Sequence, residues 1–480
     1  MKKKWLFLSL IFSVFLFFDW FVSDQIRALK IDRNILYSID DIFRFCYIKA
    51  SFFYPEIFLN PNLKILSTLI SRIFYQIFPL GMLSLRIMSS LFSVAAIYFL
   101  YKTTKRINPE KKLTILPVLF TLTSGVYFLI SISTLAESMF IFCLVLAAYL
   151  FYSKRYLFST VIMAFLPTIR QEGVIFLIVW VILLLQQNKS KYLLILFVPL
   201  FTWSLANCLI LKHSFSYTLF YFTHLTSQTP PGTLILPSEI SLGIVLSLLP
   251  AAILFGLGLI RELSNRKYLL IFLCIFFHLG FLILADLIKL FKTGYLPYVI
   301  RLFAPSIPFV SIYMSSGLEF IMHKFIQKKR GMVICLSLVV LIATSLMIFR
   351  LKEFQKFSNV KNDSVSKKEI LALDQAGLWL DDYMQRNHIA YLYALGGVAT
   401  DRFIRRTWMG VSGKIRFYAL VDSKILLDMF SFKRIPIIND KAIFISLSGN
   451  DSQYLSSFKK EFLKGFPELP LEFFILEPVK

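Results

Sequence analysis

Long apolar runs alternate with short polar segments along most of the chain. The runs lie at 5–23, 83–101, 113–131, 137–152, 155–169, 173–186, 192–211, 241–260, 268–288, 303–321 and 331–349. A helix of about 20 apolar residues crosses a hydrocarbon core of about 30 Å with every backbone group hydrogen-bonded inside the helix. The pattern therefore predicts a polytopic α-helical membrane protein with about 11 transmembrane helices.

The first apolar run follows the basic residues of MKKK, as in a secretory signal. No small-residue cleavage site follows the run, and Asp19 and Trp20 interrupt its end. We therefore interpret it as a retained first span.

Two long segments lack the pattern of a span, namely the first loop at about 24–82 and the tail from 350 to 480. In the tail, KKEILALDQAGLWLDDYMQRN has the period of a helix, and IAYLYAL, KAIFISLS and LEFFILEP have the character of strands. We expect a transmembrane domain over 1–349, which includes the large first loop, and a small α/β domain over 350–480.

The composition agrees with a membrane protein. Hydrophobic residues make up 57% of the chain and charged residues 17%, and the mean hydropathy is +0.69. A soluble domain averages about 45–50% apolar and about 25% charged residues.

Lysine and arginine are distributed unevenly over the loops. The segments on the N-terminal side of the membrane hold 19 basic residues, and the short loops on the other side hold 5. Because short cytoplasmic loops collect basic residues, we expect a cytoplasmic N-terminus, with the first loop and the tail on the outer side. The net charge of +24 then reflects topology, and we expect no nucleic-acid partner.

The chain carries no P-loop, GxGxxG, HExxH or GxSxG motif, and its five cysteines follow no metal-ligand spacing. Soluble-nucleotide chemistry and a metal site are therefore not predicted from motifs. No repeat relates the two halves of the chain, as it would in many transporters.

Asp40 and Asp41 stand side by side in SIDDIFRF, shortly after the first predicted span. Adjacent carboxylates repel each other, which suits one of them to accepting a proton. The other interpretation is a helix N-cap, because Ser38 and the two acids precede an apolar run. Spacing alone leaves both interpretations open.

Further charged residues lie at the outer ends of predicted spans, where charge is costly and tends to serve function. The candidates for substrate binding are Glu137, Arg170, Glu172, Lys292 and Arg301. Structural alternatives stay open for most of them. Glu137 suits the dipole of a helix start. Arg170 and Glu172 could form an ion pair across their turn, and Lys292 could serve topology.

Carboxylates in the first loop and cations in later loops would share the outer face. This combination suits the transfer of a sugar from a polyprenyl-phosphate carrier to an acceptor hydroxyl. A carboxylate would take the hydroxyl proton, while arginine and lysine would stabilise the phosphate leaving group.

The order of several segments along the chain resembles that in the GT-C superfamily of membrane glycosyltransferases, in particular in its protein O-mannosyltransferase and aminoarabinose transferase branch. The similar segments are SIDDIFRF, LNPNLKILSTLI, LSLRIMSSLFSVAAIYFLYKTTKRI, TLAESMF, TIRQEG and RLFAPSIPF. They cover residues 1–325 in order, and the α/β tail matches only in type.

The resemblance implies a GT-C-like fold and an inverting glycosyltransferase in a bacterial inner membrane, with its tail in the periplasm. Asp40 would be the catalytic base. Asp41 would be the second acid, which orients the acceptor or binds a metal. Arg170 and Arg301 would bind the carrier phosphate. No cofactor is implied with certainty, and a divalent metal is left open.

The implied partners are a polyprenyl-phosphate-linked sugar, a lipid, glycan or protein acceptor, and the bilayer. Asn60 stands where relatives have His or Lys before the loop proline, and Asp41 stands where the aminoarabinose branch prefers Glu. These departures affect the expected sugar and acceptor more than the reaction.

Two other functions remain open. A transporter or flippase of a lipid-linked glycan would use polar residues within the spans, such as His278 and Asp286. A non-catalytic assembly or sensor protein would depend on its tail at 350–480 but not on Asp40 and Asp41.

Overall fold

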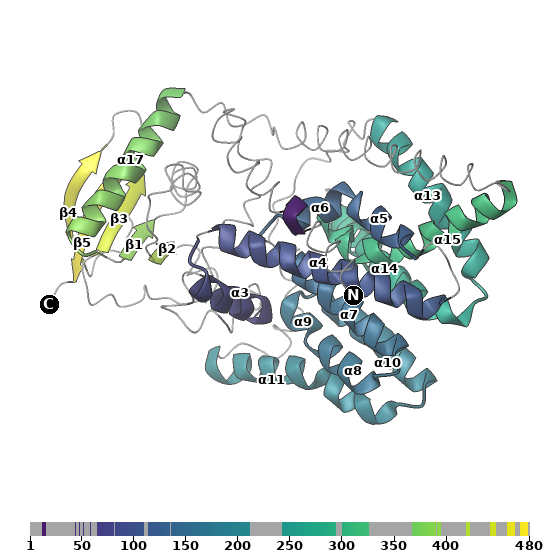
Figure 1. Ribbon diagram of the computed structural model, residues 1–480. Helices are drawn as coiled ribbons and strands as arrows, with labels where there is room; N and C mark the ends of the chain where they lie inside the picture. Colours follow the sequence, from purple (N-terminus) through teal and green to yellow (C-terminus); the bar gives the residue numbers. More distant parts are fainter. Residues whose placement is uncertain are drawn as a thin grey trace. The chain divides into compact units, whose positions relative to one another are not determined.

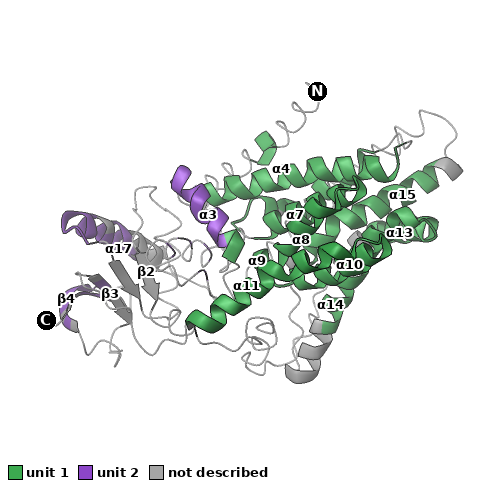
Figure 2. Cartoon of the chain, turned by 90° about the horizontal axis from the view of Figure 1, so that it is seen from below, with its two compact units in different colours: residues 1–24, 64–67, 83–358 green, residues 25–63, 68–82, 359–480 purple. Residues whose placement is uncertain are grey.

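The structure is a computed structural model. It describes residues 12–15, 44, 48, 51, 58, 65–80, 82–109, 114–134, 136–211, 242–293, 300–325, 367–389, 391–394, 419–422, 442–447, 458–465 and 471–478. Figure 2 shows the chain in two compact units, one of residues 1–24, 64–67 and 83–358 and the other of residues 25–63, 68–82 and 359–480. The domain boundary expected at 349 stays a prediction.

The first unit is helical (Figure 1). Its α-helices are α4 (Met82–Ile107), α5 (Leu116–Leu122), α6 (Gly125–Ser131), α7 (Glu137–Tyr152), α8 (Tyr156–Ala164), α9 (Leu166–Ile169), α10 (Gly173–Gln186), α11 (Leu193–Leu211), α13 (Leu242–Glu262), α14 (Leu269–Thr293) and α15 (Ile307–Phe325). Short 3-10 helices η4 (Ser190–Tyr192), η5 (Arg266–Tyr268) and η6 (Ile300–Ser306) precede α11, α14 and α15.

Several helices coincide with the predicted runs, and two runs are broken. Helices α7 and α10 have the predicted limits. The run at 113–131 forms two seven-residue helices, α5 and α6, instead of one span. The run at 155–169 is broken between α8 and α9, where Pro167 stands at the start of α9, because proline cannot continue a preceding helix. The run at 331–349 and most of 5–23 lie outside the described residues.

Among the described residues, three helical segments are long and apolar enough to cross a membrane, namely Leu83–Ile107, Ser190–Ile210 and Arg266–Leu284. Shorter apolar helices lie at Ile65–Ile77, Glu137–Tyr152, Tyr156–Ile169 and Gly173–Gln186. These helices agree with a polytopic helical membrane protein, and the expected count of spans stays a prediction.

Buried hydrogen bonds join α7, α8 and α10. Trp180 Nε1 donates to Ser159 Oγ at 3.0 Å, and Ser159 Oγ donates to the carbonyl oxygen of Ala147 at 2.8 Å. All three residues are fully buried. Satisfied polar contacts of this kind hold helices in a fixed arrangement where hydrophobic driving force between them is weak. They thereby hold α7, α8 and α10 in place relative to one another.

Helices α13 and α15 approach each other through glycines. A Cβ atom at Gly258 would lie 1.8 Å from the carbonyl oxygen of Tyr313, and one at Gly317 would lie 2.0 Å from that of Leu254. Only glycine permits this distance between the two backbones.

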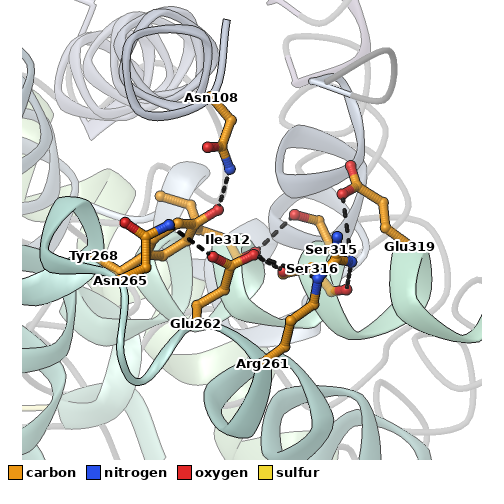
Figure 3. A network of polar contacts seen from close by, with 9 residues as sticks. All are labelled: Asn108, Arg261, Glu262, Asn265, Tyr268, Ile312, Ser315, Ser316 and Glu319. Carbon is orange, nitrogen blue, oxygen red and sulfur yellow. Dashed lines mark hydrogen bonds and ion pairs between the residues drawn. The ribbon is translucent and has the colours of Figure 1, made fainter. Parts of the chain in front are cut away.

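A polar network joins the same two helices (Figure 3). The Glu262 carboxylate accepts from Ser316 Oγ at 2.5 Å and from Asn265 Nδ2 at 3.1 Å. Asn108, just after α4, donates to the Tyr268 hydroxyl. The network thus connects the ends of α4 and α13 and the middle of α15 with η5.

The helix α3 (Ile65–Ile77) is amphipathic and too short to span a bilayer. Leu69, Ile73 and Ile77 are exposed at spacings of four residues, whereas Ser67 and Ser71 are buried. An exposed apolar stripe of this kind is typical of helices that lie along a membrane interface.

The second unit contains a five-stranded sheet in the order β2-β1-β3-β5-β4. Its elements are α17 (Lys367–Arg386), β1 (Tyr391–Ala394), β2 (Ala419–Asp422), β3 (Ala442–Leu447), β4 (Phe458–Gly465) and β5 (Leu471–Pro478). Strand β1 pairs in parallel with β2 and β3, and β5 pairs antiparallel with β3 and β4. Trp379 of α17 packs against Phe473 of β5 with ring centroids 5.2 Å apart, so α17 covers one face of the sheet (Figure 1).

The predicted helix and the three predicted strands of the tail are present as α17, β1, β3 and β5. The sequence analysis did not single out β2 and β4. Strand β4 lies at the edge of the sheet and reads FKKEFLKG. Edge strands carry lysines that discourage pairing with another chain, and the strand pattern is weak for that reason.

Candidate functional site

Three charged residues from two turns meet in a buried cluster, which we call the Arg170 cluster (Glu137, Arg170 and Glu172). Arg170 Nη2 and Nε donate to the two carboxylate oxygens of Glu172 at 2.6 Å and 3.1 Å. Arg170 Nη1 forms an ion pair with Glu137 Oε1. The exposed fractions of Glu137, Arg170 and Glu172 are 1%, 5% and 5%. The guanidinium is therefore held by a bidentate pair on one side and a second carboxylate on the other.

Local sequence places these groups. Glu137 is the first residue of α7, where a carboxylate suits the helix dipole. Arg170 ends α9 in extended backbone, and Glu172 is the N-cap residue of α10. A Cβ atom at Gly173 would lie 2.4 Å from the carbonyl carbon of Leu166. Glycine at 173 therefore allows α10 to start directly against α9.

The charges of the Arg170 cluster act on one another strongly. Burial by itself lowers the pKa of Arg170, but the charges and hydrogen bonds of Glu137 and Glu172 outweigh burial and raise that pKa well above its ordinary value. Arg170 stays protonated as a result. The structure thus forms the ion pair between Arg170 and Glu172 that was one interpretation of the turn, and it adds Glu137 to that pair. The role of these three residues toward a substrate stays a prediction.

A second buried pair lies next to the Arg170 cluster. His278 of α14 has no exposed surface, and its Nδ1 lies 2.6 Å from Ser306 Oγ at the end of η6. The His278 ring packs on Phe176 of α10 with centroids 5.3 Å apart. Phe176 stands one turn after Glu172 on the same face of α10. The pair of His278 and Ser306 thus connects η6 to the helix that begins at the Arg170 cluster.

The other predicted site residues are placed less fully. Arg301 is the second residue of η6, and Lys292 lies near the end of α14. The structure describes the backbone of both residues but not their side chains. The 3-10 helix η6, which contains Arg301, packs against α6, α7 and α14.

Asp40 and Asp41 lie outside the described residues. The first-loop residues that are described contact α3. Arg44 Nη2 donates to Ser71 Oγ at 3.2 Å, and Arg72 Nη1 donates to the carbonyl oxygen of Ser51 at 2.7 Å. The chain that follows the acid pair is therefore attached to α3 at two points.

Two polar residues were not singled out from the sequence. Ser306 pairs with His278, and it stands inside the RLFAPSIPF segment. Arg86 lies near the start of α4 and is 3% exposed. A buried arginine at the end of an apolar helix is costly and marks functional regions. That signal was present in the sequence for Arg86, whereas Ser306 becomes visible only through its partner.

Among the described residues, no group of three or more His, Cys, Asp or Glu side chains could hold a metal ion. The described part of the site therefore consists of carboxylates, guanidinium groups, a histidine and a serine. Such groups can bind an anion, orient a hydroxyl and move a proton.

Comparison with known proteins gives a likeness of fold. No protein-family model matches the sequence, and no curated protein matches it either. The crystal structure of ArnT from Cupriavidus metallidurans bound to undecaprenyl phosphate is similar over 99% of this chain and 98% of its own, with a TM-score of 0.55 and 12% identity. The apo crystal structure of the same ArnT is similar over the same shares of both chains, with a TM-score of 0.53 and 12% identity. The likeness covers both the helical part and the tail, so the chain has the GT-C-like fold that its ordered segments predicted.

Proposed function

We propose that the protein transfers a sugar from a polyprenyl-phosphate-linked donor to an acceptor hydroxyl on the outer face of a bacterial inner membrane. The observation that carries this proposal is the likeness of nearly the whole chain to an ArnT structure bound to undecaprenyl phosphate. The buried Arg170 cluster gives additional support, because charge inside an apolar helical protein is retained where it serves a site.

The proposed reaction is a single displacement. Asp40 takes the proton of the acceptor hydroxyl as its oxygen attacks the anomeric carbon from the side opposite the phosphate. The bond between that carbon and the phosphate oxygen breaks, and the phosphate leaves on the lipid with the negative charge. The configuration at the anomeric carbon is thereby inverted.

Arginine would stabilise the leaving phosphate in this scheme. Arg301 fits this role, because it is the second residue of η6, and η6 packs against α6, α7 and α14. Arg170 already has two carboxylate partners. We therefore assign Arg170 to shaping the site and Arg301 to the carrier phosphate. Asp41 would orient the acceptor or bind a divalent metal.

The proposal is tested by comparing lipid-linked sugars and surface glycans in cells with and without the protein, by mass spectrometry. A transferase predicts that one polyprenyl-phosphate sugar accumulates and that one decoration disappears when the gene is deleted. The accumulated species would name the donor, and the missing decoration would name the acceptor. Unchanged lipid-linked sugars and glycans would contradict the proposal.

The base assignment needs the isolated protein. Asp40→Asn keeps the size of the side chain and removes its ability to accept the proton, so we expect transfer to slow by about 10²–10⁴-fold. Asp382→Asn is the matched control, because Asp382 is exposed on α17. A flippase would move the lipid-linked sugar across a vesicle bilayer without forming a new glycosidic bond. Full transfer by Asp40→Asn would remove Asp40 from the base role.

A further inference from the structure

We propose that His278 is a positioning residue that holds η6, through Ser306, in the place where Arg301 meets the carrier phosphate. The inference rests on the proposed function, because it concerns how the carrier is bound. It assigns a role to a buried histidine that neither touches the reacting atoms nor belongs to the Arg170 cluster.

The first support is the bond between His278 and Ser306. The two residues come from separate elements, α14 and η6, and they are 0% and 3% exposed. His278 Nδ1 and Ser306 Oγ are 2.6 Å apart, which is a short hydrogen bond for a nitrogen and an oxygen. A buried polar group that loses such a partner destabilises the fold by about 1–3 kcal/mol, because its hydrogen bonds to water are not replaced. The pair therefore fixes the end of η6 against α14.

The second support is the packing of the His278 ring. The ring lies against Phe176, and Phe176 lies against Phe140 with centroids 5.8 Å apart. Phe140 stands one turn after Glu137 on α7, and Phe176 stands one turn after Glu172 on α10. His278 is thus connected through two aromatic rings to both helices whose starts form the Arg170 cluster.

The third support is the nature of η6 itself. It is a seven-residue 3-10 helix that contains Pro305, and 3-10 helices longer than three or four residues are uncommon because their hydrogen bonds are poor. Its position must depend on contacts with neighbouring elements. Arg301 lies five residues before Ser306, about 10 Å along such a helix. A shift at Ser306 would therefore move the Arg301 backbone, and a misplacement of about 1 Å in a site can cost 10²-fold in rate.

A relay role in transport is the competing explanation for a histidine within an apolar helix. The described contacts of His278 are the hydrogen bond between Nδ1 and Ser306 and the packing of the ring on Phe176. Both contacts hold the ring in one place, which is what positioning requires. The observed contacts therefore favour positioning.

The test separates the hydrogen bond from the ring packing. His278→Phe keeps a ring against Phe176 and loses the bond to Ser306. His278→Asn loses the ring but places an amide near Nδ1, where it can still pair with Ser306. Ser306→Ala removes the bond from the other side. Each full-length variant is placed in lipid nanodiscs, and binding of undecaprenyl phosphate is measured together with KM and kcat for the lipid-linked donor.

We expect His278→Phe and Ser306→Ala to raise the Kd for undecaprenyl phosphate and the donor KM by about 5–10-fold, which corresponds to about 1 kcal/mol for one hydrogen bond. The kcat should fall as well, because Arg301 also stabilises the leaving phosphate, and His278→Asn should bind the carrier nearly as the wild type does. The double variant His278→Phe/Ser306→Ala should bind the carrier no more weakly than the weaker-binding of the two single variants, because both changes remove the same hydrogen bond.

Arg301→Ala is the positive control, and Ser315→Ala is the matched negative control. Ser315 is a buried serine of α15 whose hydroxyl donates to the carbonyl oxygen of Ile312 within its own helix. Normal carrier binding by His278→Phe and Ser306→Ala would overturn the positioning role, as would equal losses for His278→Phe and His278→Asn. If Arg301→Ala weakens binding in the same experiment, only the positioning role is lost. A wild-type protein that does not bind the carrier would overturn the proposed function as well. If His278→Phe does not fold, Ser306→Ala decides the outcome.

Discussion

The Arg170 cluster places one buried cation between two buried carboxylates. Removing charges from water costs several kcal/mol per ion, and mutual attraction repays that cost only when the geometry is good. Here, the bidentate pair with Glu172 and the contact with Glu137 supply that geometry. Such an arrangement contributes little net stability relative to apolar residues, but the loss of one member lowers the free energy of unfolding strongly. The cluster therefore favours a defined geometry at the starts of α7 and α10.

Arg170→Ala would leave two carboxylates buried side by side without their shared cation. We expect the free energy of unfolding to fall by about 3–5 kcal/mol, measured by thermal or chemical unfolding in detergent. Arg170→Lys should lose part of that amount, because lysine cannot form the bidentate pair.

The control for Arg170 is Arg386, which pairs with Asp382 on the surface of α17 with 76% of its side chain exposed. Arg386→Ala should change the free energy of unfolding by less than about 0.5 kcal/mol. Equal effects of Arg170→Ala and Arg386→Ala would mean that the cluster is hydrated and has no special geometry.

The members of the Arg170 cluster could be predicted singly but not as a group. Glu137, Arg170 and Glu172 were noticed because charge stood at the ends of apolar runs. The ion pair of Arg170 and Glu172 followed from their closeness in sequence. The contact with Glu137 depends on how α7 packs on α9, and no periodic pattern encodes that packing. The same holds for His278 and Ser306, which come together only through α14 and η6.

At the scale of elements, the limits of an apolar run predicted the limits of a helix well where the run forms a single helix. Helices α7 and α10 have the expected limits. The run at 113–131 was wrong as one helix, because Thr123 and Ser124 separate α5 from α6. Short hydroxyl side chains compete for backbone hydrogen bonds and favour such breaks. Hydropathy does not detect them, since the neighbouring residues stay apolar.

The crossing of α13 and α15 gives a test with an internal control. Gly258→Ala would place a Cβ atom against the carbonyl oxygen of Tyr313, which belongs to the backbone and cannot move alone. We expect the two helices to separate and the protein to lose at least about 2 kcal/mol of unfolding free energy, of the order measured for overpacking. Thermal unfolding of the purified protein measures the loss.

Gly256 stands two residues earlier on the same helix, and a Cβ atom there would meet nothing within 4 Å. Gly256→Ala should be neutral or stabilise the protein by about 0.4–1 kcal/mol, because alanine restricts the unfolded chain. The paired result would establish that close approach, and not helix propensity, explains the glycine at 258. A harmless Gly258→Ala would show that α13 and α15 are farther apart than the structure places them.

At the scale of the whole molecule, the likeness to ArnT spans nearly the full chain at 12% identity. Few residues are shared, so the fold must depend on features that tolerate substitution. The order of apolar runs is such a feature, because any apolar side chain satisfies a lipid-facing position. The alternation of positive charge between loops is another such feature, because lysine and arginine are interchangeable in it. Both features were visible in the sequence, which explains why the fold could be predicted and the acceptor could not.

Those loop charges predict that the tail and the loops before α11 and α14 lie on opposite sides of the membrane. Single cysteines report this directly, after the five native cysteines are replaced by serine or alanine. Suitable sites are Ser190 and Ser264 in the two basic loops and Arg386 on α17, which are all exposed. Each single-cysteine protein is treated in intact cells with a maleimide that does not cross the inner membrane.

Arg386→Cys should react in cells whose outer membrane is permeable, while Ser190→Cys and Ser264→Cys should react only after the inner membrane is opened. The reason is the excess of 19 basic residues over 5 on the N-terminal side, where each basic residue near the membrane favours retention in the cytoplasm. The opposite pattern would place the Arg170 cluster and the predicted acid pair on the cytoplasmic face. If all three sites were labelled from one side, the number of spans between the basic loops and the tail would have to be even. The tail would then not lie on the outer face, where the proposed transfer takes place.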